Sequence, residues 1–321
     1  EVTIGISVPV LSNPFWRAFA DFGTKAANAL GAKTIVVDAN QNDSEQLDQI
    51  MGLIAGGIDG LVITPNTSAI APSLLRQAER AGIPVVLAER WPGFGPDEWD
   101  GASYVGFVGV DNVLAGYNIA KALYEAGVRK IVATGGVSGV AVADERAAGL
   151  HMFLDEHPDM VLLQELRNGE LREVGLQNAE NYLSAFPGPG FDGLWSYNDD
   201  CALGSIQAFK RAGVLDSVKV AGMDLIDEAV EAIKNGELLF STGGQWVESA
   251  IAVIMVYDAI HGKLPAVPVL ELELPNVTIE NVAAYEEQFV KNEPEYDFVN
   301  FSQVGKSTLF RTFLKRHQLK I

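Results

Sequence analysis

Short apolar strands alternate with amphipathic helices along most of this 321-residue chain, and no other feature constrains its fold as strongly. A strand over 34–38 precedes a helix over 44–54, in which apolar side chains recur every three or four residues. A strand over 60–65 and a helix over 69–81 repeat this order. Parallel strands need a long crossover, which is usually a helix, so the alternation predicts a parallel sheet with helices on both faces.

The same alternation starts again in the second half of the chain. A strand over 104–109 leads to a helix over 113–127, and a strand over 129–134 leads to a helix that starts near Asp144. Further strands are expected at 160–166, 192–196, 217–222 and 238–243. Two similar halves of about 110 to 140 residues each predict an α/β fold of two Rossmann-like, doubly wound lobes.

Polar residues follow the strands at the points where the strands end. After the first strand, Asn13 is followed by the aromatic pair Phe15 and Trp16 at the start of a helix. The pattern recurs at Glu89-Arg90, Asn198-Asp199-Asp200, Asp224 and Gln245. Ligands of open α/β sheets bind at the carboxyl ends of the strands, and an amide beside two aromatic rings suits a small molecule with polar edges and an apolar face. The sequence therefore predicts a binding cleft rather than a catalytic triad or a metal site.

Charge and residue spacing exclude several classes of function. The formal net charge is −19, and such a surface repels phosphate backbones, so we expect no nucleic-acid binding. The single cysteine, Cys201, is expected to open a buried helix as a small apolar residue. Gly305-Lys306-Ser307 lacks the leading glycine and the preceding strand of a phosphate loop, and Gly-x-Ser-x-Gly is absent. The histidines are dispersed, without the spacing of paired metal ligands: His151, His157, His261 and His317. We therefore expect no enzyme activity, no cofactor and no metal.

The last thirty residues differ from the rest of the chain. Residues 288–301 are charged and aromatic, and 303–321 form a basic amphipathic stretch. One interpretation is a helix that packs on a lobe, or a remnant of the expressed sequence; the other is a contact with a membrane or a partner. The sequence leaves both open.

An ordered set of short motifs gives the chain a resemblance to a known family over roughly residues 1–290. These motifs are Ser12-Asn13-Pro14-Phe15-Trp16, Asp59-Gly60-Leu61-Val62-Ile63-Thr64-Pro65, Gly82-Ile83-Pro84-Val85-Val86, Asp111-Asn112, Glu145-Arg146-Ala147-Ala148-Gly149, Tyr197-Asn198-Asp199-Asp200-Cys201-Ala202-Leu203-Gly204 and Val220-Ala221-Gly222-Met223-Asp224. Each is weak alone, but their order resembles that of type I periplasmic substrate-binding proteins of the ribose, galactose and related-sugar group.

The resemblance implies a particular domain organisation. It predicts an N-terminal lobe of residues 1–109 plus 247–273 and a C-terminal lobe of 110–246 plus 274–290, followed by an extension over 291–321. Three crossing segments, near 108–111, 244–247 and 272–276, would form a hinge between the lobes.

The resemblance also assigns roles to the polar strand ends. Asn13 would offer a donor and an acceptor to hydroxyl groups, and Phe15 and Trp16 would wall a sugar ring, unless they are ordinary helix-start core. Glu89 and Arg90 would bind vicinal hydroxyls, the alternative being a surface ion pair. The remaining candidates for ligand contact are Asn198, Asp224 and Gln245. The alternative role is a buried helix cap for Asn198 and a hydrogen bond within the hinge for Gln245.

Two departures from the ribose binders alter the expected ligand. Those proteins carry an arginine where this chain has Asp144, and an aromatic residue around the position of Glu170. Arg146 either is structural or partly replaces the lost arginine. Glu89, Asp144, Asp224 and Glu170 would together make a carboxylate-rich pocket, which accepts hydrogen bonds from hydroxyl or ammonium groups. A hexose, a pentose or a polyol is therefore expected rather than plain ribose, with an amino sugar as a minor alternative.

Ligand capture by hinge closure is the function that the resemblance implies. A monomer would bind the sugar or polyol in an interlobe cleft and deliver it to the membrane subunits of an ABC transporter. The resemblance implies a periplasmic or extracytoplasmic location. The sequence begins in a strand without a starting Met or a signal peptide, as expected of a mature or trimmed form, so the missing targeting segment does not indicate a cytoplasmic protein. The alternative is the effector-binding core of a lactose-repressor-like transcription regulator, which would carry a basic helical headpiece.

Overall fold

The computed structural model describes residues 1–188, 190–291 and 296–306, which form two compact units. The first unit comprises Glu1–Val110, Gln245–Glu273 and the described residues 296–306. The second comprises Asp111–Gly244 and residues 274–291. The chain thus passes from one unit to the other after Val110, Gly244 and Glu273, and again between residues 291 and 296.

A six-stranded, fully parallel sheet forms the centre of the first unit. Its strand order is β13-β5-β4-β3-β1-β2, so the chain winds outward in both directions from β1 and β3. The strands are β1 (Thr3–Val8), β2 (Lys33–Asp38), β3 (Gly60–Ile63), β4 (Val85–Ala88), β5 (Tyr104–Val110) and β13 (Val269–Leu272). Every residue of β3, β4 and β5 is buried, which explains why these strands read as continuous apolar runs rather than as alternating ones.

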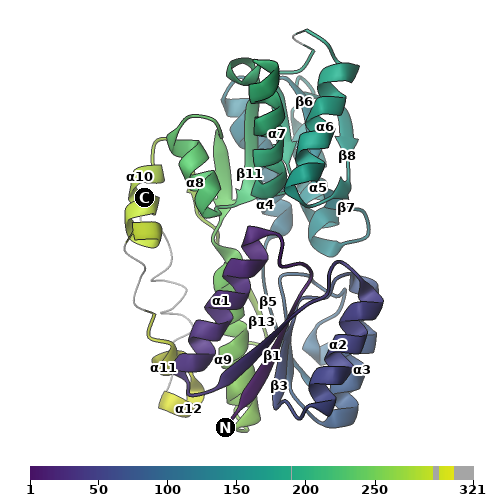
Figure 1. The fold of residues 1–321 in the computed structure, drawn as a ribbon, viewed down its shortest axis with the longest axis vertical. Coiled ribbons are helices and arrows are strands. Elements are labelled where there is room, and N and C mark those ends of the chain that lie inside the picture. Colours follow the sequence, from purple (N-terminus) through teal and green to yellow (C-terminus); the bar gives the residue numbers. More distant parts are fainter. Residues whose placement is uncertain (189, 292–295, 307–321) are drawn as a thin grey trace. The chain divides into compact units, whose positions relative to one another are not determined.

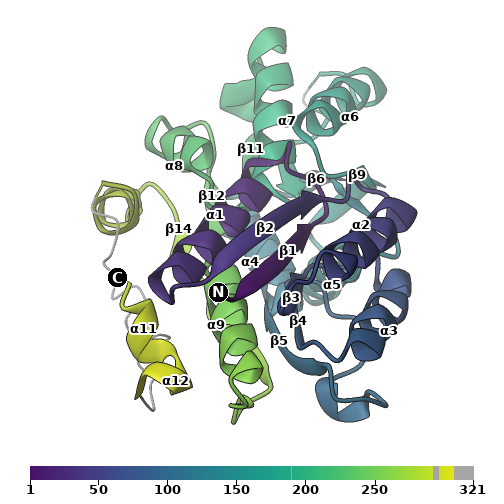
Figure 2. The ribbon, with the colours of Figure 1, turned by 60° about the horizontal axis from the view of Figure 1, so that its bottom comes forward.

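Helices cover both faces of this sheet. The helices α1 and α9 lie on one face, and α2 and α3 lie on the other (Figures 1 and 2). Gly60 and Gly106 let α9 approach the sheet, because a Cβ at either position would lie 2.4 Å or less from Val256 or Met255 of α9. The helices are α1 (Pro14–Ala29), α2 (Asp43–Ala55), α3 (Ala71–Ala81) and α9 (Glu248–Ile260), with short 3₁₀ turns at η1 (Ser68–Ile70), η2 (Pro96–Glu98) and η4 (Gln245–Val247).

The second unit contains another six-stranded sheet, in the order β14-β12-β11-β10-β6-β8. All its strand pairs are parallel except β12 with the edge strand β14. The strands are β6 (Lys130–Thr134), β8 (Val161–Leu166), β10 (Gly193–Ser196), β11 (Lys219–Asp224), β12 (Phe240–Gly243) and β14 (Asn276–Val277); β7 (Gly136–Val137) and β9 (Asn168–Gly169) form a separate antiparallel pair.

Two closely packed helix pairs cover this second sheet, with α6 and α7 toward the viewer in Figure 1 and α4 and α5 behind. Glycines allow the close approach: a Cβ at Gly116, Gly149, Gly175 or Gly204 would lie 1.9–2.0 Å from a main-chain carbonyl oxygen of the facing helix. The helices are α4 (Asn112–Glu125), α5 (Ala141–Glu156), α6 (Arg172–Ala185), α7 (Asp199–Ala212) and α8 (Asp227–Lys234), with a 3₁₀ turn at η3 (Leu215–Ser217).

The C-terminal segment contributes to both units. In the second unit, α10 (Val282–Tyr285) and the π-helical η5 (Glu286–Lys291) follow β14, and Lys234 of α8 pairs with Glu286 at 2.8 Å. In the first unit, α11 (Phe298–Phe301) contacts α1 and α9, and α12 (Gln303–Lys306) follows. The basic stretch expected over 303–321 is described only as far as 306; the rest lies outside the described residues.

The predicted α/β class with two doubly wound lobes is confirmed by the two mainly parallel sheets, one in each unit. Several boundaries differ by a few residues. For example, the helix expected to start near Asp144 begins at Ala141, with Asp144 inside its first turn, where it accepts a hydrogen bond from the Gly139 N–H. No helix in the described ranges is both long and apolar enough to cross a membrane.

Candidate functional site

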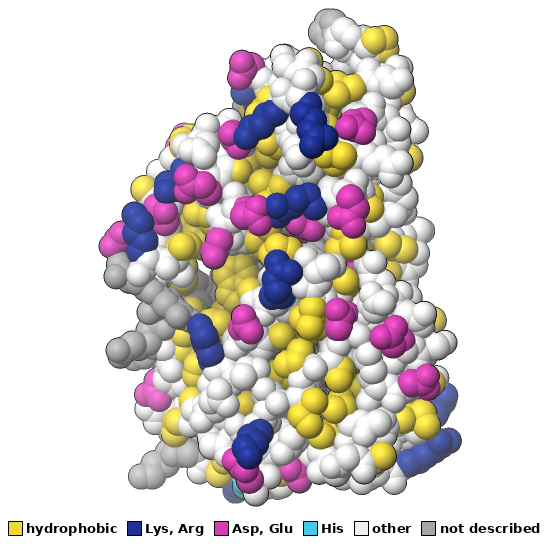
Figure 3. Space-filling model, in the orientation of Figure 1, with side chains coloured by type: hydrophobic (Ala, Val, Ile, Leu, Met, Phe, Trp, Pro, Cys, Tyr) yellow, Lys and Arg dark blue, Asp and Glu magenta, His cyan; other side chains and the backbone are white. Residues whose placement is uncertain are grey.

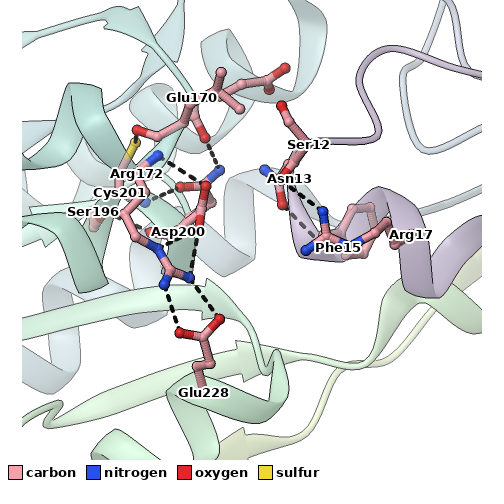
Figure 4. Close-up of polar contacts among 12 residues, drawn as sticks. Ser12, Asn13, Phe15, Arg17, Glu170, Arg172, Ser196, Asp200, Cys201 and Glu228 are labelled. Carbon is pink, nitrogen blue, oxygen red and sulfur yellow. Dashed lines mark hydrogen bonds and ion pairs between the residues drawn. The ribbon is translucent and has the colours of Figure 1, made fainter. Parts of the chain in front are cut away.

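Asn13 lies at the junction between β1 and α1. Its side chain is 2% exposed and accepts a hydrogen bond from the Phe15 N–H at 3.0 Å, so it caps the helix (Figure 4). The Arg17 guanidinium closes the same turn by donating to the carbonyl oxygens of Leu11 and Ser12 at 2.8 and 3.0 Å. The turn after β1 is therefore rigid, and its polar amide has a fixed orientation.

The two aromatic residues after Asn13 are both buried. Phe15 and Trp16 meet edge to face with their ring centroids 4.8 Å apart, and Trp16 also packs on Phe19 at 5.4 Å. The guanidinium of Arg90 lies 5.5 Å from the Trp16 ring, at cation–π distance. The aromatic pair thus packs at the start of α1, and Trp16 also contacts the guanidinium of Arg90, which follows β4.

Glu89 and Arg90 directly follow strand β4, and each is only 2% exposed, so the alternative of a surface ion pair is wrong. Glu89 has a φ of 62°, in the left-handed region that residues other than glycine rarely adopt. Its N–H still donates to the Val108 carbonyl at 2.9 Å, and the Arg90 Nη1 donates to the Asn66 carbonyl at 2.6 Å. Backbone strain of this kind is typical of sites where function dictates the direction of a side chain.

Gln46, which was not predicted, fixes the loop that receives Arg90. This side chain of α2 is fully buried, and its Nε2 donates to the Ser7 Oγ at 3.0 Å and to the Thr64 carbonyl at 2.8 Å. Its Oε1 accepts from the Asn66 N–H at 2.8 Å. The signal was a glutamine four residues before Ile50, on the buried face of a helix where an apolar residue is expected.

In the second unit, Asn198 caps α7 and also holds the chain after β9. Its Oδ1 accepts from the Cys201 N–H at 2.9 Å, and its Nδ2 donates to the Glu170 carbonyl at 2.9 Å. Asn198 and Glu170 are 2% and 5% exposed. The predicted capping role is therefore present, and the same amide positions Glu170.

Asp224 is the last residue of strand β11 and, like Glu89 directly after β4, combines a buried carboxylate with a left-handed backbone. Its φ is 121° and that of Leu225 is 57°. The adjacent strand allows this, because a Cβ at Gly243 would lie 2.2 Å from the Asp224 main chain. Behind the turn, the fully buried Asp199 carboxylate accepts from the Leu225 N–H at 2.7 Å and from the Ser241 Oγ at 2.8 Å. Burial, together with the nearby charge of Asp224, raises the pKa of Asp199.

Asp200 belongs to a network of ion pairs at the start of α6. The Arg172 Nε and main-chain N–H both donate to its carboxylate at 2.9 Å, and the Arg172 Nη1 lies 2.6 Å from the Glu228 Oε2 (Figure 4). Burial raises the pKa of Asp200, and Arg172 opposes that rise. The network ties α6, α7 and α8 together.

The two residues at the start of α5 have different surroundings. The Asp144 side chain is 47% exposed and pairs with Arg167. Arg146 is buried, donates to the Asn112 Oδ1 at 2.9 Å and to the Tyr197 carbonyl at 3.0 Å, and lies 4.7 Å from the Tyr197 ring centroid. Arg146 thus links α5 to α4 and to Tyr197, the residue after β10.

Gln245 opens η4 in the first unit, directly after Gly244, and is fully buried. The preceding Gly244 has a φ of 88°, which explains a glycine there. The polar side chain is thus held at the point where the chain passes from one unit to the other.

The residues that the structure describes give little support for a catalytic or a metal site. Within residues 1–188, 190–291 and 296–306, no three His, Cys, Asp or Glu side chains are grouped so as to hold a metal ion. Cys201 is buried in α7 as expected, and burial raises the pKa of its thiol, which disfavours the reactive thiolate. On the face shown in Figure 3, Lys and Arg side chains lie among Asp and Glu side chains rather than in a separate basic patch.

Comparison with known proteins decides the family. The family model described as periplasmic binding protein domain matches residues 4–264. The chain belongs to this family. Among curated relatives, the ribose import binding protein of Bacillus subtilis is 30% identical over 266 residues, which cover 82% of this chain and 83% of that protein. A xylitol-binding protein of Mycolicibacterium smegmatis is 27% identical over 273 residues, covering 82% of this chain and 76% of that protein.

Solved structures of periplasmic binding proteins show the same fold. A solute-binding protein of an ABC transporter from Actinobacillus succinogenes, with bound D-allose, has a TM-score of 0.81 and 26% identity, covering 89% of this chain and all of that one. One from Bacillus halodurans, with bound myo-inositol, has a TM-score of 0.79 and 25% identity, covering 89% of this chain and 98% of that one. The predicted resemblance is confirmed.

Proposed function

We propose that this periplasmic binding protein captures a small sugar or polyol outside the cytoplasm, closes around it by hinge motion and delivers it to an ABC importer. One observation carries the proposal: at the carboxyl end of a central strand, each unit places a buried carboxylate on left-handed backbone, Glu89 directly after β4 and Asp224 as the last residue of β11. Each unit also carries a buried amide that caps a helix, Asn13 or Asn198. Two such clusters in one chain suit a ligand that both units bind.

The chemistry of these clusters matches a polyhydroxylated ligand. Carboxylates accept hydrogen bonds from hydroxyls, Arg90 donates in a planar fork, and an amide does both. The buried rings of Phe15 and Trp16 supply the apolar surface on which the C–H face of a sugar packs. Ligand contacts made only in the closed state would favour that state, which is how binding drives closure.

The ligand class follows from the relatives together with the two departures. The similar proteins are named for ribose and xylitol, or were solved with D-allose and myo-inositol, all of them uncharged polyols or sugars. In this chain Asp144 is paired with Arg167, which offsets one of the negative charges that would attract an ammonium group. We therefore favour a neutral sugar or polyol over an amino sugar. The buried Glu170 and Gln245 would be among its hydrogen-bond partners. The protein would act as a monomer and perform no reaction on the ligand.

A thermal-shift screen of unfolded and refolded protein tests the proposal, since refolding removes any ligand carried through purification. The panel contains D-ribose, D-xylose, D-allose, xylitol, myo-inositol and glucosamine. A compound that binds only the folded state raises the Tm, and saturation at 100 times its Kd contributes about 2.7 kcal/mol. We expect one stereochemical class to raise the Tm, and Arg90→Ala to abolish the rise.

Arg76→Ala is the matched control, because Arg76 is an exposed arginine of α3 in the same unit. It should leave the shift unchanged. A panel without any shift would contradict sugar capture, and full binding by Arg90→Ala would contradict the assigned cluster.

A further inference from the structure

The turn that carries Asp224 is held in a conformation that its own residues disfavour. Asp224 and Leu225 are consecutive non-glycine residues with φ of 121° and 57°. For residues with a Cβ, such backbone persists only where the surroundings impose it. The groups that impose it here are therefore part of the site even if they never reach a ligand.

Asp199 supplies the main contact from behind the turn. Its Oδ2 accepts from the Leu225 N–H at 2.7 Å, and the Ser241 Oγ donates to both carboxylate oxygens at 2.8 and 2.9 Å. The Leu225 N–H also lies 3.3 Å from the Ser241 Oγ, which is its second acceptor. Asp199 is fully buried, and these donors occupy its carboxylate, so it serves the turn rather than a ligand.

The surroundings of Asp199 call for a group with two acceptor oxygens. One main-chain N–H and one hydroxyl donate to it, one bond to Oδ2 and the other shared between both oxygens. The two oxygens of an aspartate accept from both donors, whereas an asparagine of the same shape would turn an NH₂ donor toward one of them. A side chain without oxygen would leave the Leu225 N–H with only its longer contact to the Ser241 Oγ.

We propose that Asp199 is a positioning residue for ligand binding: by accepting from the Leu225 N–H it fixes the left-handed turn that aims the Asp224 carboxylate. This inference rests on the proposed function, which gives Asp224 its ligand. It adds to the binding site a residue of α7 that acts through the backbone of the turn after β11 rather than by contacting the ligand.

The test compares Asp199→Ala and Asp199→Asn with Ser205→Ala. Ser205 is the control, because its buried hydroxyl lies on the same helix but donates to the Gly175 and Cys201 carbonyls, away from the turn. Two quantities are measured: the Kd for the panel compound that most raises the wild-type Tm, by calorimetry, and amide hydrogen exchange at Leu225 in ligand-free protein, by NMR.

We expect Asp199→Ala to weaken binding at least tenfold and to speed Leu225 exchange at least tenfold, while circular dichroism stays that of the wild type. Asp199→Asn should fall between, because one side-chain oxygen remains to accept. Ser205→Ala should change neither quantity. Wild-type affinity in Asp199→Ala would overturn the inference, as would unchanged protection of the Leu225 amide.

If Asp199→Ala fails to fold, Ser241→Ala takes its place, since it removes the hydroxyl that holds the carboxylate against the turn. It should weaken binding less than Asp199→Asn does and speed Leu225 exchange; unchanged values of both would overturn the inference. The exchange measurement needs no ligand. A wild-type protein that binds nothing in the panel would therefore refute the proposed function, while Leu225 exchange would still decide whether Asp199 fixes the turn.

Discussion

The strand-end turn of the first unit and that of the second present the same kind of group but are supported differently. Glu89 and Asp224 are both buried carboxylates on left-handed backbone. In the first unit the support is indirect: the neutral amide of Gln46 holds the loop whose Asn66 carbonyl accepts a hydrogen bond from Arg90. In the second unit the support is direct, because the carboxyl group of Asp199 accepts from the Leu225 N–H within the turn. The comparison teaches that a strand-end turn can be supported by a neutral amide or by a titratable group, and only the second kind of support couples the turn to pH.

The largest effect should come from replacing the strained carboxylates by glycine. Glu89→Gly and Asp224→Gly each remove a charged hydrogen-bond acceptor, worth about 1.5–3 kcal/mol, or roughly 10- to 150-fold in Kd. Glycine adopts positive φ freely, so the ligand-free protein should lose no stability from the backbone. Calorimetry for the Kd and urea unfolding for stability measure the two effects separately.

The two glycine variants also test whether the units are equivalent. Comparable losses of affinity would show that both strand ends bind the ligand. If only one variant loses affinity, the parallel between Glu89 and Asp224 fails for the other, whose strain would then have a purely structural cause.

The sequence predicted the fold well because the alternation of strands and helices is a local signal repeated many times. It also found the strand-end residues Asn13, Glu89, Asn198 and Asp224, since polar side chains directly after apolar strands are costly unless they have a use. It did not find their supports. Gln46 is separated by 39 residues from Ser7, its hydrogen-bond partner, and such pairs exist only once the sheet has formed.

Asp199 shows a second limit of sequence reasoning. It was visible within Asn198-Asp199-Asp200, yet nothing local distinguishes three adjacent polar residues whose roles differ. Asn198 caps the helix, Asp199 holds a turn 26 residues away, and Asp200 pairs with Arg172. The direction of each side chain at the start of α7 decides its role, and that direction depends on which elements pack around it.

A smaller effect is expected from removing the neutral support. Gln46→Leu leaves the Thr64 carbonyl and the Asn66 N–H buried without their partner, at a cost of about 1–3 kcal/mol for each group left unsatisfied. The free energy of unfolding in urea measures the loss. Gln49→Leu, one turn along α2, is the control. The half-buried Gln49 donates to the Asp38 carbonyl and, at 3.3 Å, to the exposed Glu45 carboxylate, so its loss should cost less. Equal losses would show that Gln46 has no special role in the loop.

The smallest effect, and the one that separates the two supports, is a difference in pH dependence. The pKa of Asp199 is raised in the folded protein, so between the ordinary carboxyl value of 3.8 and the raised value the folded state holds a proton that the unfolded state has lost. The free energy of unfolding contributed by this group therefore falls as pH rises through that window.

Asp199→Asn lacks the contribution, so its stability relative to the wild type should increase with pH. The difference between Gln46→Leu and the wild type should stay flat, because an amide does not titrate. Urea unfolding of the three proteins from pH 4 upward measures both differences in unfolding free energy. If the difference between Asp199→Asn and the wild type does not change with pH, Asp199 does not couple the second turn to pH, and this contrast between the two supports fails.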